Sequence, residues 1–326
     1  MSELSTTYMG LQLQNPIIIA SSQLTATPKK IEAAVRSGAG AIVLKSIFEE
    51  NVRRATRELT ANTASPSSLD VHDLLDGLGE SYVLDDYLGL VEEAKRLGSI
   101  PIIASLNCRS VKAWVDYARK LENVGADGLE LNIFELAAET KTGGREVEKR
   151  TVEIVHKVAS AVSISVSAKL GPHYSSLGEL AEELRSAGAK AIVLFNRFHR
   201  PDIDIERVRY SPAPIFSSET EGTLPLRWIA LLSGRINIDF AASTGIHDAA
   251  GVIRQLLAGA RSVQLCTTLY LHGVEHIGTV LAELSAWMKH HKYASVADFR
   301  GLLCSERTKG ARQVDQTQYN ELLARG

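Results

Sequence analysis

The chain carries the stretch Ala187-Gly-Ala-Lys-Ala-Ile-Val-Leu-Phe-Asn196, in which a small-residue turn leads directly into an apolar strand. Close variants of this stretch recur at 37–46, 124–132 and 258–267. Each turn can end a helix, because glycine tolerates the left-handed conformation found at helix C-termini. Each strand then ends on polar residues. The repeat therefore predicts helix–strand units whose strand ends carry side chains able to contact a ligand.

Four further strand-like runs, at 16–21, 101–107, 164–169 and 236–243, alternate with the repeated units. Eight strands that alternate with helices predict an α/β fold, a single eight-stranded parallel β/α (TIM) barrel. Serines and asparagine interrupt several strands, and we expect them to fill hydrogen-bonded layers inside the barrel. These interior candidates are Ser105, Ser163, Ser165, Ser167 and Asn237.

Other segments frame the predicted barrel, which we take as one domain over 1–326. A hairpin over 6–14 should close the bottom of the barrel, and the first helix should run from Pro28 to Arg36. A helical tail should cover about 291–326. Insertions at about 48–82 and 198–223 follow strand ends, the side on which barrels build active sites.

Composition excludes several classes of protein. The net charge of −2 and the lack of a basic run argue against nucleic acid as a partner. No apolar stretch approaches the roughly 20 residues that span a bilayer, and the N-terminus does not resemble a signal peptide. Three cysteines, Cys108, Cys266 and Cys304, lie too far apart for a metal or iron–sulphur motif. We therefore expect a cytoplasmic protein with free thiols and no bound metal.

Two strand ends carry the pattern of a phosphate site. Ser243-Thr-Gly-Ile246 follows the seventh strand and Gln264-Leu-Cys-Thr267 follows the eighth. Barrels often bind phosphate between these two loops, and Gly245 would allow close approach of the backbone. The alternative is a plain strand-to-helix turn capped by hydroxyl groups. Lys45 and Lys169 end two other strands, and each should face either an anionic ligand or a carboxylate at the barrel mouth.

These strand ends together resemble the dihydroorotate dehydrogenase family over about residues 5–300. The motifs that carry the resemblance are Ala20-Ser21, Lys45-Ser46, Glu130-Leu-Asn132, Lys169-Leu-Gly-Pro172, Asn196, Ser243-Thr-Gly-Ile246 and Gln264-Leu-Cys-Thr267. The resemblance implies an FMN-dependent oxidoreductase that takes a proton and a hydride from a dihydropyrimidine-like substrate, as in the oxidation of dihydroorotate to orotate in pyrimidine biosynthesis.

The same resemblance implies roles for individual residues. Lys169 would lie at the N1–C2=O pole of the flavin, where negative charge appears when a hydride reaches N5. The FMN contacts would come from Ala20, Ser21, Lys45, Ser46, Asn132, Lys169, Ser243, Thr244, Gly245, Cys266 and Thr267. The substrate contacts would come from Lys45, Asn132 and Asn196, whose amides can both donate and accept.

Three departures from the family pattern bear on the chemistry. Glu135 stands where cytosolic members carry a cysteine base, and an unperturbed glutamate is a weaker base by roughly four pKa units. His173, Tyr174 and His199 are reserve proton donors, and Glu135 could instead pair with a lysine across the mouth. The family's substrate loop is not evident around Arg57–Asn62, and Cys266 replaces a glycine at the phosphate site.

Two other functions remain open from the sequence. Lys169 could form a Schiff base in an aldolase, or the chain could be an FMN-binding subunit without activity.

We expect a homodimer through Phe195, Phe198, Phe216 and Trp228 near the second insertion, with core packing as the alternative for Trp228. The Phe195–Asp204 run could shape a pocket for an anionic substrate or form a solvated hairpin. Electrons would leave to a soluble acceptor such as fumarate or to a separate electron-transfer partner that uses NAD.

Overall fold

The computed structural model describes residues 3–50, 84–98, 100–135, 138, 140–198, 201–211 and 214–306. The expected insertion at 48–82 lies almost wholly outside these residues, as do Arg57–Asn62 and His199. The last part of the expected tail, 307–326, also lies outside them.

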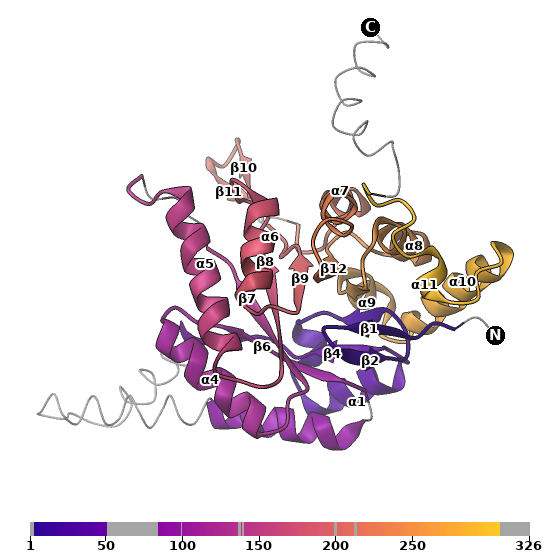
Figure 1. Ribbon diagram of the computed structural model, residues 1–326, viewed down its shortest axis with the longest axis horizontal. Coiled ribbons are helices and arrows are strands. Elements are labelled where there is room, and N and C mark those ends of the chain that lie inside the picture. Colours follow the sequence, from indigo (N-terminus) through magenta and orange to yellow (C-terminus); the bar gives the residue numbers. More distant parts are fainter. Residues whose placement is uncertain are drawn as a thin grey trace, which may run out of the picture.

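Eight parallel strands close into a barrel, which confirms the predicted fold (Figure 1). They are β3 (Ile17–Ile19), β4 (Ala41–Val43), β6 (Ile102–Asn107), β7 (Gly128–Ile133), β8 (Ser165–Leu170), β9 (Ala191–Leu194), β12 (Asp239–Ser243) and β13 (Ser262–Leu265). Strands pair in this order, and β13 pairs with β3 to complete the ring. A short strand, β5 (Ile47–Phe48), extends the pairing at the end of β6.

Helices surround the strands, and Figure 1 shows α4, α5 and α6 on one side of the barrel and α7 and α8 on the other. The helices are α1 (Pro28–Arg36), a helix over 84–97, α4 (Val111–Asn123), α5 (Gly144–Ala159), α6 (Leu177–Ser186), α7 (Thr223–Leu232), α8 (Ala249–Ala258), α9 (Thr267–His272), α10 (His276–His290) and α11 (Val296–Phe299). Two short 3₁₀ helices, η1 (Gln23–Thr25) and η2 (Glu219–Gly222), lie in strand-to-helix connections. Outward strand residues such as Leu129 and Val166 pack against these helices in the main core.

The predicted N-terminal hairpin is present and fills the lower interior of the barrel. Its strands are β1 (Thr6–Tyr8) and β2 (Leu11–Leu13), paired antiparallel. Tyr8, Met9 and Leu13 form a separate buried cluster with inward residues of β3, β4, β6, β9 and β12. The Met9 N–H also donates to Asp239 Oδ2 at 2.8 Å, which ties the hairpin to the start of β12. One end of the barrel interior is therefore apolar and closed.

Several expected boundaries were wrong. The seventh strand begins at Asp239, because residues 236–238 form bends in which the Ile238 N–H donates to the Ile236 carbonyl. Asn237 is consequently exposed rather than interior. Ser163 also precedes its strand and is exposed, where its N–H and hydroxyl bind Glu122. Ser105 and Ser167 are buried inside the barrel as expected.

The C-terminal segment is less helical than expected within the described residues. Only α11 is helical after residue 291, and turns follow it to residue 306. These turns bind α8 and α7 through their backbone, since Gly301 and Leu303 donate to Leu256 and Leu257, and Ser305 donates to Ala230. No helix in the described ranges is long and apolar enough to cross a membrane.

The second insertion contains an antiparallel hairpin, β10 (Asp202–Asp204) and β11 (Arg209–Ser211). Figure 1 shows this hairpin projecting beyond the barrel. Charged and apolar side chains are exposed on it. Of the described residues in the Phe195–Asp204 run, only Asp202–Asp204 belongs to this solvated hairpin, whereas Asn196 and Arg197 line a cavity at the barrel mouth. The following segment, from Pro214, returns to the barrel mouth.

Candidate functional site

A buried polar cluster occupies the upper interior of the barrel, above the apolar hairpin. Lys169 extends inward from β8, Glu130 from β7 and Gln264 from β13, and all three are buried. Lys169 Nζ donates to Gln264 Oε1 at 2.7 Å and lies 3.5 Å from Glu130 Oε1. Gln264 Nε2 donates to Glu130 Oε2 in a short hydrogen bond. The sequence left open whether Lys169 faces an anionic ligand or a carboxylate. In the structure its ammonium group lies beside the carboxylate of Glu130.

A chain of hydroxyl groups lies beside this cluster. Ser46 Oγ is 3.0 Å from Ser21 Oγ and 2.7 Å from Ser105 Oγ, and the Ser46 N–H donates to Ser21 Oγ at 2.9 Å. Tyr87 then bridges the backbone of Ser105, donating to its carbonyl and accepting from its N–H. These contacts hold the ends of β3, β4 and β6 together, and they orient Ser21 and Ser46 at the barrel mouth.

A cavity of about 170 Å³, which we call the loop cavity, opens between the loops after β12 and β13. It is lined by Ala20, Ser21, Lys169, Asn196, Arg197, Ile215, Ser217, Ser243, Thr244, Gly245, Ile246, Gln264, Cys266 and Thr267. Thr268 Oγ1 donates to the His247 carbonyl at 2.7 Å and so links the two loops. Burial raises the pKa of the Cys266 thiol, with the charge of Lys169 opposing this effect. A neutral thiol at this position leaves hydroxyl and backbone groups to bind an anion.

The segment after the β10–β11 hairpin closes one wall of the loop cavity. The Ser217 N–H and hydroxyl both donate to Thr267 Oγ1, at 3.2 and 3.0 Å. A threonine hydroxyl that accepts two hydrogen bonds keeps its own proton to donate. Thr267 can therefore donate this proton to an acceptor in the cavity.

Arg197 also lines the loop cavity but acts as a clamp for the same segment. Its guanidinium donates to the carbonyls of Pro214, Ile215 and Phe216 and makes two hydrogen bonds to Glu221. A guanidinium has five N–H groups, so these bonds use its whole donor capacity. Arg197 thus holds the cavity wall in place, and a bound anion would have to meet other donors.

A second cavity of about 260 Å³, the mouth cavity, adjoins the first through Ser21, Lys169 and Asn196. It is also lined by Ser22, Gln23, Lys45, Ser46, Phe48, Glu130 and Asn132. Asn196 Nδ2 donates to Asn132 Oδ1 at 2.6 Å, and Asn107 Nδ2 donates to the Asn132 carbonyl. The side-chain Nδ2 group of Asn132 and the side-chain Oδ1 of Asn196 keep hydrogen-bonding capacity for a ligand. Lys169 lies where the two cavities meet.

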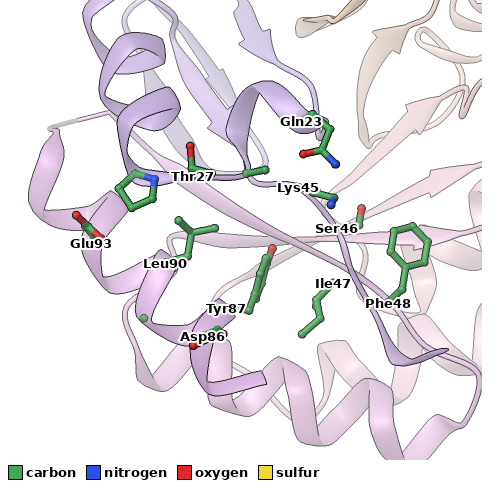
Figure 2. Close-up of a pocket in the computed structure, with 13 residues that line it drawn as sticks. Gln23, Thr27, Lys45, Ser46, Ile47, Phe48, Asp86, Tyr87, Leu90 and Glu93 are labelled. Atoms are coloured by element: carbon green, nitrogen blue, oxygen red, sulfur yellow. The ribbon is translucent and has the colours of Figure 1, made fainter. Parts of the chain in front are cut away.

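A larger cavity of about 640 Å³, the outer cavity, lies outside the mouth. Figure 2 shows the residues that line it. The outer cavity shares Gln23, Lys45, Ser46 and Phe48 with the mouth cavity. Its other wall is the helix over 84–97, from which Asp86, Tyr87, Leu90 and Glu93 extend. The cavities therefore run from the loops after β12 and β13 to the flank of the barrel.

Glu135 lies apart from these cavities. It lines a side cavity of about 170 Å³ behind the ends of β7 and β8, with His173, Tyr174 and Phe198 among the other lining residues. Its carboxylate pairs with Arg150 Nη1 of α5 at 3.2 Å, so the expected lysine partner was wrong. Burial raises the pKa of Tyr174, and the charges of Glu135 and Glu148 add to it against a hydrogen bond from Thr151.

The structure thus brings together all the predicted site residues except Glu135. The loop and mouth cavities together contain Ala20, Ser21, Lys45, Ser46, Asn132, Lys169, Asn196, Ser243, Thr244, Gly245, Cys266 and Thr267. Sequence reasoning assigned no role to Glu130 and Gln264, although both stood in the quoted motifs. It missed Ser217 as a wall residue, because no periodic pattern marks its segment, whereas Arg197 stood in the Phe195–Asp204 run that was expected to shape a pocket or form a hairpin.

The fold and these cavities define a class of β/α barrel with hydroxyl groups at the loop cavity and a buried lysine beside a polar mouth. A family model described as "Dihydroorotate dehydrogenase" matches residues 3–288. The chain belongs to this family, whose members are oxidoreductases that act on CH–CH bonds.

Three named relatives illustrate the range of the family. The catalytic subunit of dihydroorotate dehydrogenase B (NAD(+)) from Thermoplasma acidophilum is 28% identical over 93% of this chain and 99% of its own length. A putative dihydroorotate dehydrogenase A (fumarate) from Aeropyrum pernix is 26% identical over 92% of this chain and 97% of its own length. The chloroplastic dihydropyrimidine dehydrogenase (NADP(+)) from Arabidopsis thaliana is 23% identical over 92% of this chain and 76% of its own length.

Gly245 provides a test of how the loop cavity is built. Its φ is +73°, and an added Cβ would collide with the backbone of Gly222 rather than enter the cavity. We expect Gly245→Ala to push η2 away from the loop after β12 and to lower the free energy of unfolding by about 1–3 kcal/mol. Denaturant unfolding measures this change. Gly278→Ala is the matched control, because nothing lies near its Cβ position in α10. An unchanged stability for Gly245→Ala would contradict the packing described here.

Proposed function

We propose that this chain is an FMN-dependent dehydrogenase that oxidises a dihydropyrimidine-like ring, with dihydroorotate as the reference substrate. One ring carbon loses a proton to a base and its neighbour loses a hydride to flavin N5. The observation that carries the proposal is the position of Lys169, which is buried at the junction of two cavities. Bound FMN would supply the two-electron acceptor for this reaction.

The residues of the loop cavity fit the phosphate end of such a cofactor. The free proton of Thr267 and the hydroxyl of Ser243 offer donors on one side. Ser217 and the Arg197 clamp keep the opposite wall closed. Lys169 then offers positive charge where the ring system would begin, as a flavin that accepts a hydride requires.

The mouth cavity fits a planar ring with amide groups. Asn132 and Asn196 orient each other, so their remaining donors and acceptors point in defined directions. Lys45 lines the same cavity and would attract an anionic substituent on the ring. Lys169 is a poor candidate for a Schiff base, because its ammonium contacts to Gln264 and Glu130 oppose the neutral amine that such chemistry needs.

The relatives' names bear on the route by which electrons leave. One is named as the catalytic subunit of dihydroorotate dehydrogenase B (NAD(+)) and another as a putative dihydroorotate dehydrogenase A (fumarate). We propose that electrons leave this chain to a separate electron-transfer partner or to a soluble acceptor. The outer cavity opens beside the mouth cavity and offers a path of approach from outside.

The cofactor assignment is tested on the purified protein. We expect FMN absorbance in the visible range, FMN release on denaturation, and anaerobic bleaching by dihydroorotate or another dihydropyrimidine. Gly245→Ala should purify with less FMN than Gly278→Ala, because the former displaces a wall of the loop cavity. A colourless protein that cannot be reconstituted with FMN would contradict the proposal, and so would a borohydride-trapped adduct on Lys169.

The base is tested at Glu135, which we retain as the proton acceptor. In the structure Arg150 holds its carboxylate in the side cavity, so the residues after β7 would have to turn towards the mouth. We expect Glu135→Gln to slow single-turnover flavin reduction about 10²- to 10⁴-fold, the usual contribution of a general base. Glu146→Gln is the matched control, since Glu146 also lies near Arg150 but is more exposed. Equal rates for Glu135→Gln and wild type would show that another group takes the proton.

We also propose a homodimer, now centred on the β10–β11 hairpin. Phe195 is buried and Trp228 packs against the core, so neither belongs to such an interface. Ile205 and Val208 are 78% and 86% exposed, and Ile203 and Tyr210 lie beside them on the hairpin. We expect light scattering to show a dimer that Ile205→Lys weakens by at least tenfold, whereas Leu303→Lys, at another exposed apolar position, leaves it intact. A monomer at micromolar concentration would contradict this proposal.

A further inference from the structure

Glu130 is the most deeply buried carboxylate in contact with the candidate site. It is 1% exposed, against 6% for Lys169 and 2% for Gln264. Charged side chains at such depth are retained in proteins when they are paired, because an unpaired buried charge is very costly. Inward positions lower in the barrel are filled by apolar residues instead. The charge of Glu130 therefore calls for a reason connected with Lys169.

The hydrogen bonds define which groups contact each oxygen of Glu130. A lysine ammonium can only donate, so the Gln264 atom that faces Lys169 must be the carbonyl oxygen. The amide group of Gln264 must then face Glu130, where it donates to Oε2. The other oxygen, Oε1, has no hydrogen-bond donor within the described residues and lies 3.5 Å from Lys169 Nζ. Glu130 therefore meets one hydrogen-bond donor, the Gln264 amide, and one positive charge, the Lys169 ammonium.

We infer that Glu130 is a positioning residue that sets how much of the positive charge of Lys169 reaches a flavin in the adjoining cavities. The inference rests on the proposed FMN function. Glu130 offsets part of the charge of Lys169, and Gln264 holds the two groups at a constant separation. The reduction potential of the cofactor then reflects the difference between the two charges and not Lys169 alone.

The influence of Glu130 extends through the barrel interior. Burial raises the pKa of both the Tyr8 and Tyr87 hydroxyls, and the negative charge of Glu130 raises each of them further. Tyr8 belongs to the hairpin below the cluster and Tyr87 to the helix beside the mouth. A charge that acts on both sides of the interior also acts on a ligand that touches Lys169. Glu130 itself lines the mouth cavity.

The experiment compares the reduction potentials of bound flavin by anaerobic titration against a reference dye. We expect Glu130→Gln to increase the ratio of reduced to oxidised flavin at least tenfold at a given applied potential, which is about 30 mV for a two-electron couple. Lys169→Met should shift the ratio in the opposite direction. Ser167→Ala is the control, because Ser167 is an inward, buried and uncharged neighbour on β8. An unchanged or lowered potential for Glu130→Gln would overturn the inference.

A second comparison covers the case in which Glu130→Gln does not fold. Lys169→Met leaves Glu130 unpaired, whereas Lys169→Met/Glu130→Gln removes both charges together, which buried ion pairs tolerate better. The double variant should have a higher potential than Lys169→Met, and equal potentials would overturn the inference. If wild type binds no flavin, the proposed function fails. If flavin is bound but these potentials do not differ, only the role of Glu130 fails.

Discussion

The contact between Lys169 and Gln264 is the interaction on which the upper half of the barrel depends. It joins β8 to β13 across the interior, and Gln264 passes the contact on to Glu130 of β7. In a closed barrel alternate strand residues must point inward, so the interior has to be filled whether or not a ligand is present. The lower half is filled by Tyr8, Met9 and Leu13 of the hairpin. The upper half is filled by polar groups that bond to one another, and Lys169 among them lines both the loop cavity and the mouth cavity.

The walls of the site follow from a second constraint. The backbone carbonyls of the long insertion after β9 need hydrogen-bond donors. The segment around Ser217 has no strand or helix of its own, so its carbonyls need external donors. Arg197 supplies them, and it is itself balanced by Glu221. Gly245 then packs directly on Gly222 at the start of α7. The position of the loop-cavity wall therefore depends on the hydrogen bonds of Arg197 and on the packing of Gly245 against Gly222.

These two constraints explain what the sequence could predict. The barrel was predictable because each repeated unit is local: a glycine turn, an apolar strand and a polar end recur within ten residues. The grouping of Ser243, Thr267 and Lys169 followed from the rule that parallel strands end on one face. The position of Glu135 was not predictable, because its direction depends on Arg150, which comes from a different helix. The predictions that Ser163 and Asn237 lie inside the barrel were wrong for a related reason. The residue at which a strand begins depends on which partner binds the backbone N–H groups there.

The residues whose positions could be predicted from the sequence also differ in their proposed chemical role from those whose positions could not. The residues that would hold FMN lie at strand ends, where backbone geometry determines their positions. Glu135, the proposed base, lies on a connection, where a single ion pair such as Glu135–Arg150 can redirect a side chain. A family can therefore keep its cofactor site while its substrate chemistry changes. In this chain the interior charges follow the first rule, because Lys169 can remain buried only while Glu130 of the neighbouring strand β7 and Gln264 from across the barrel contact it.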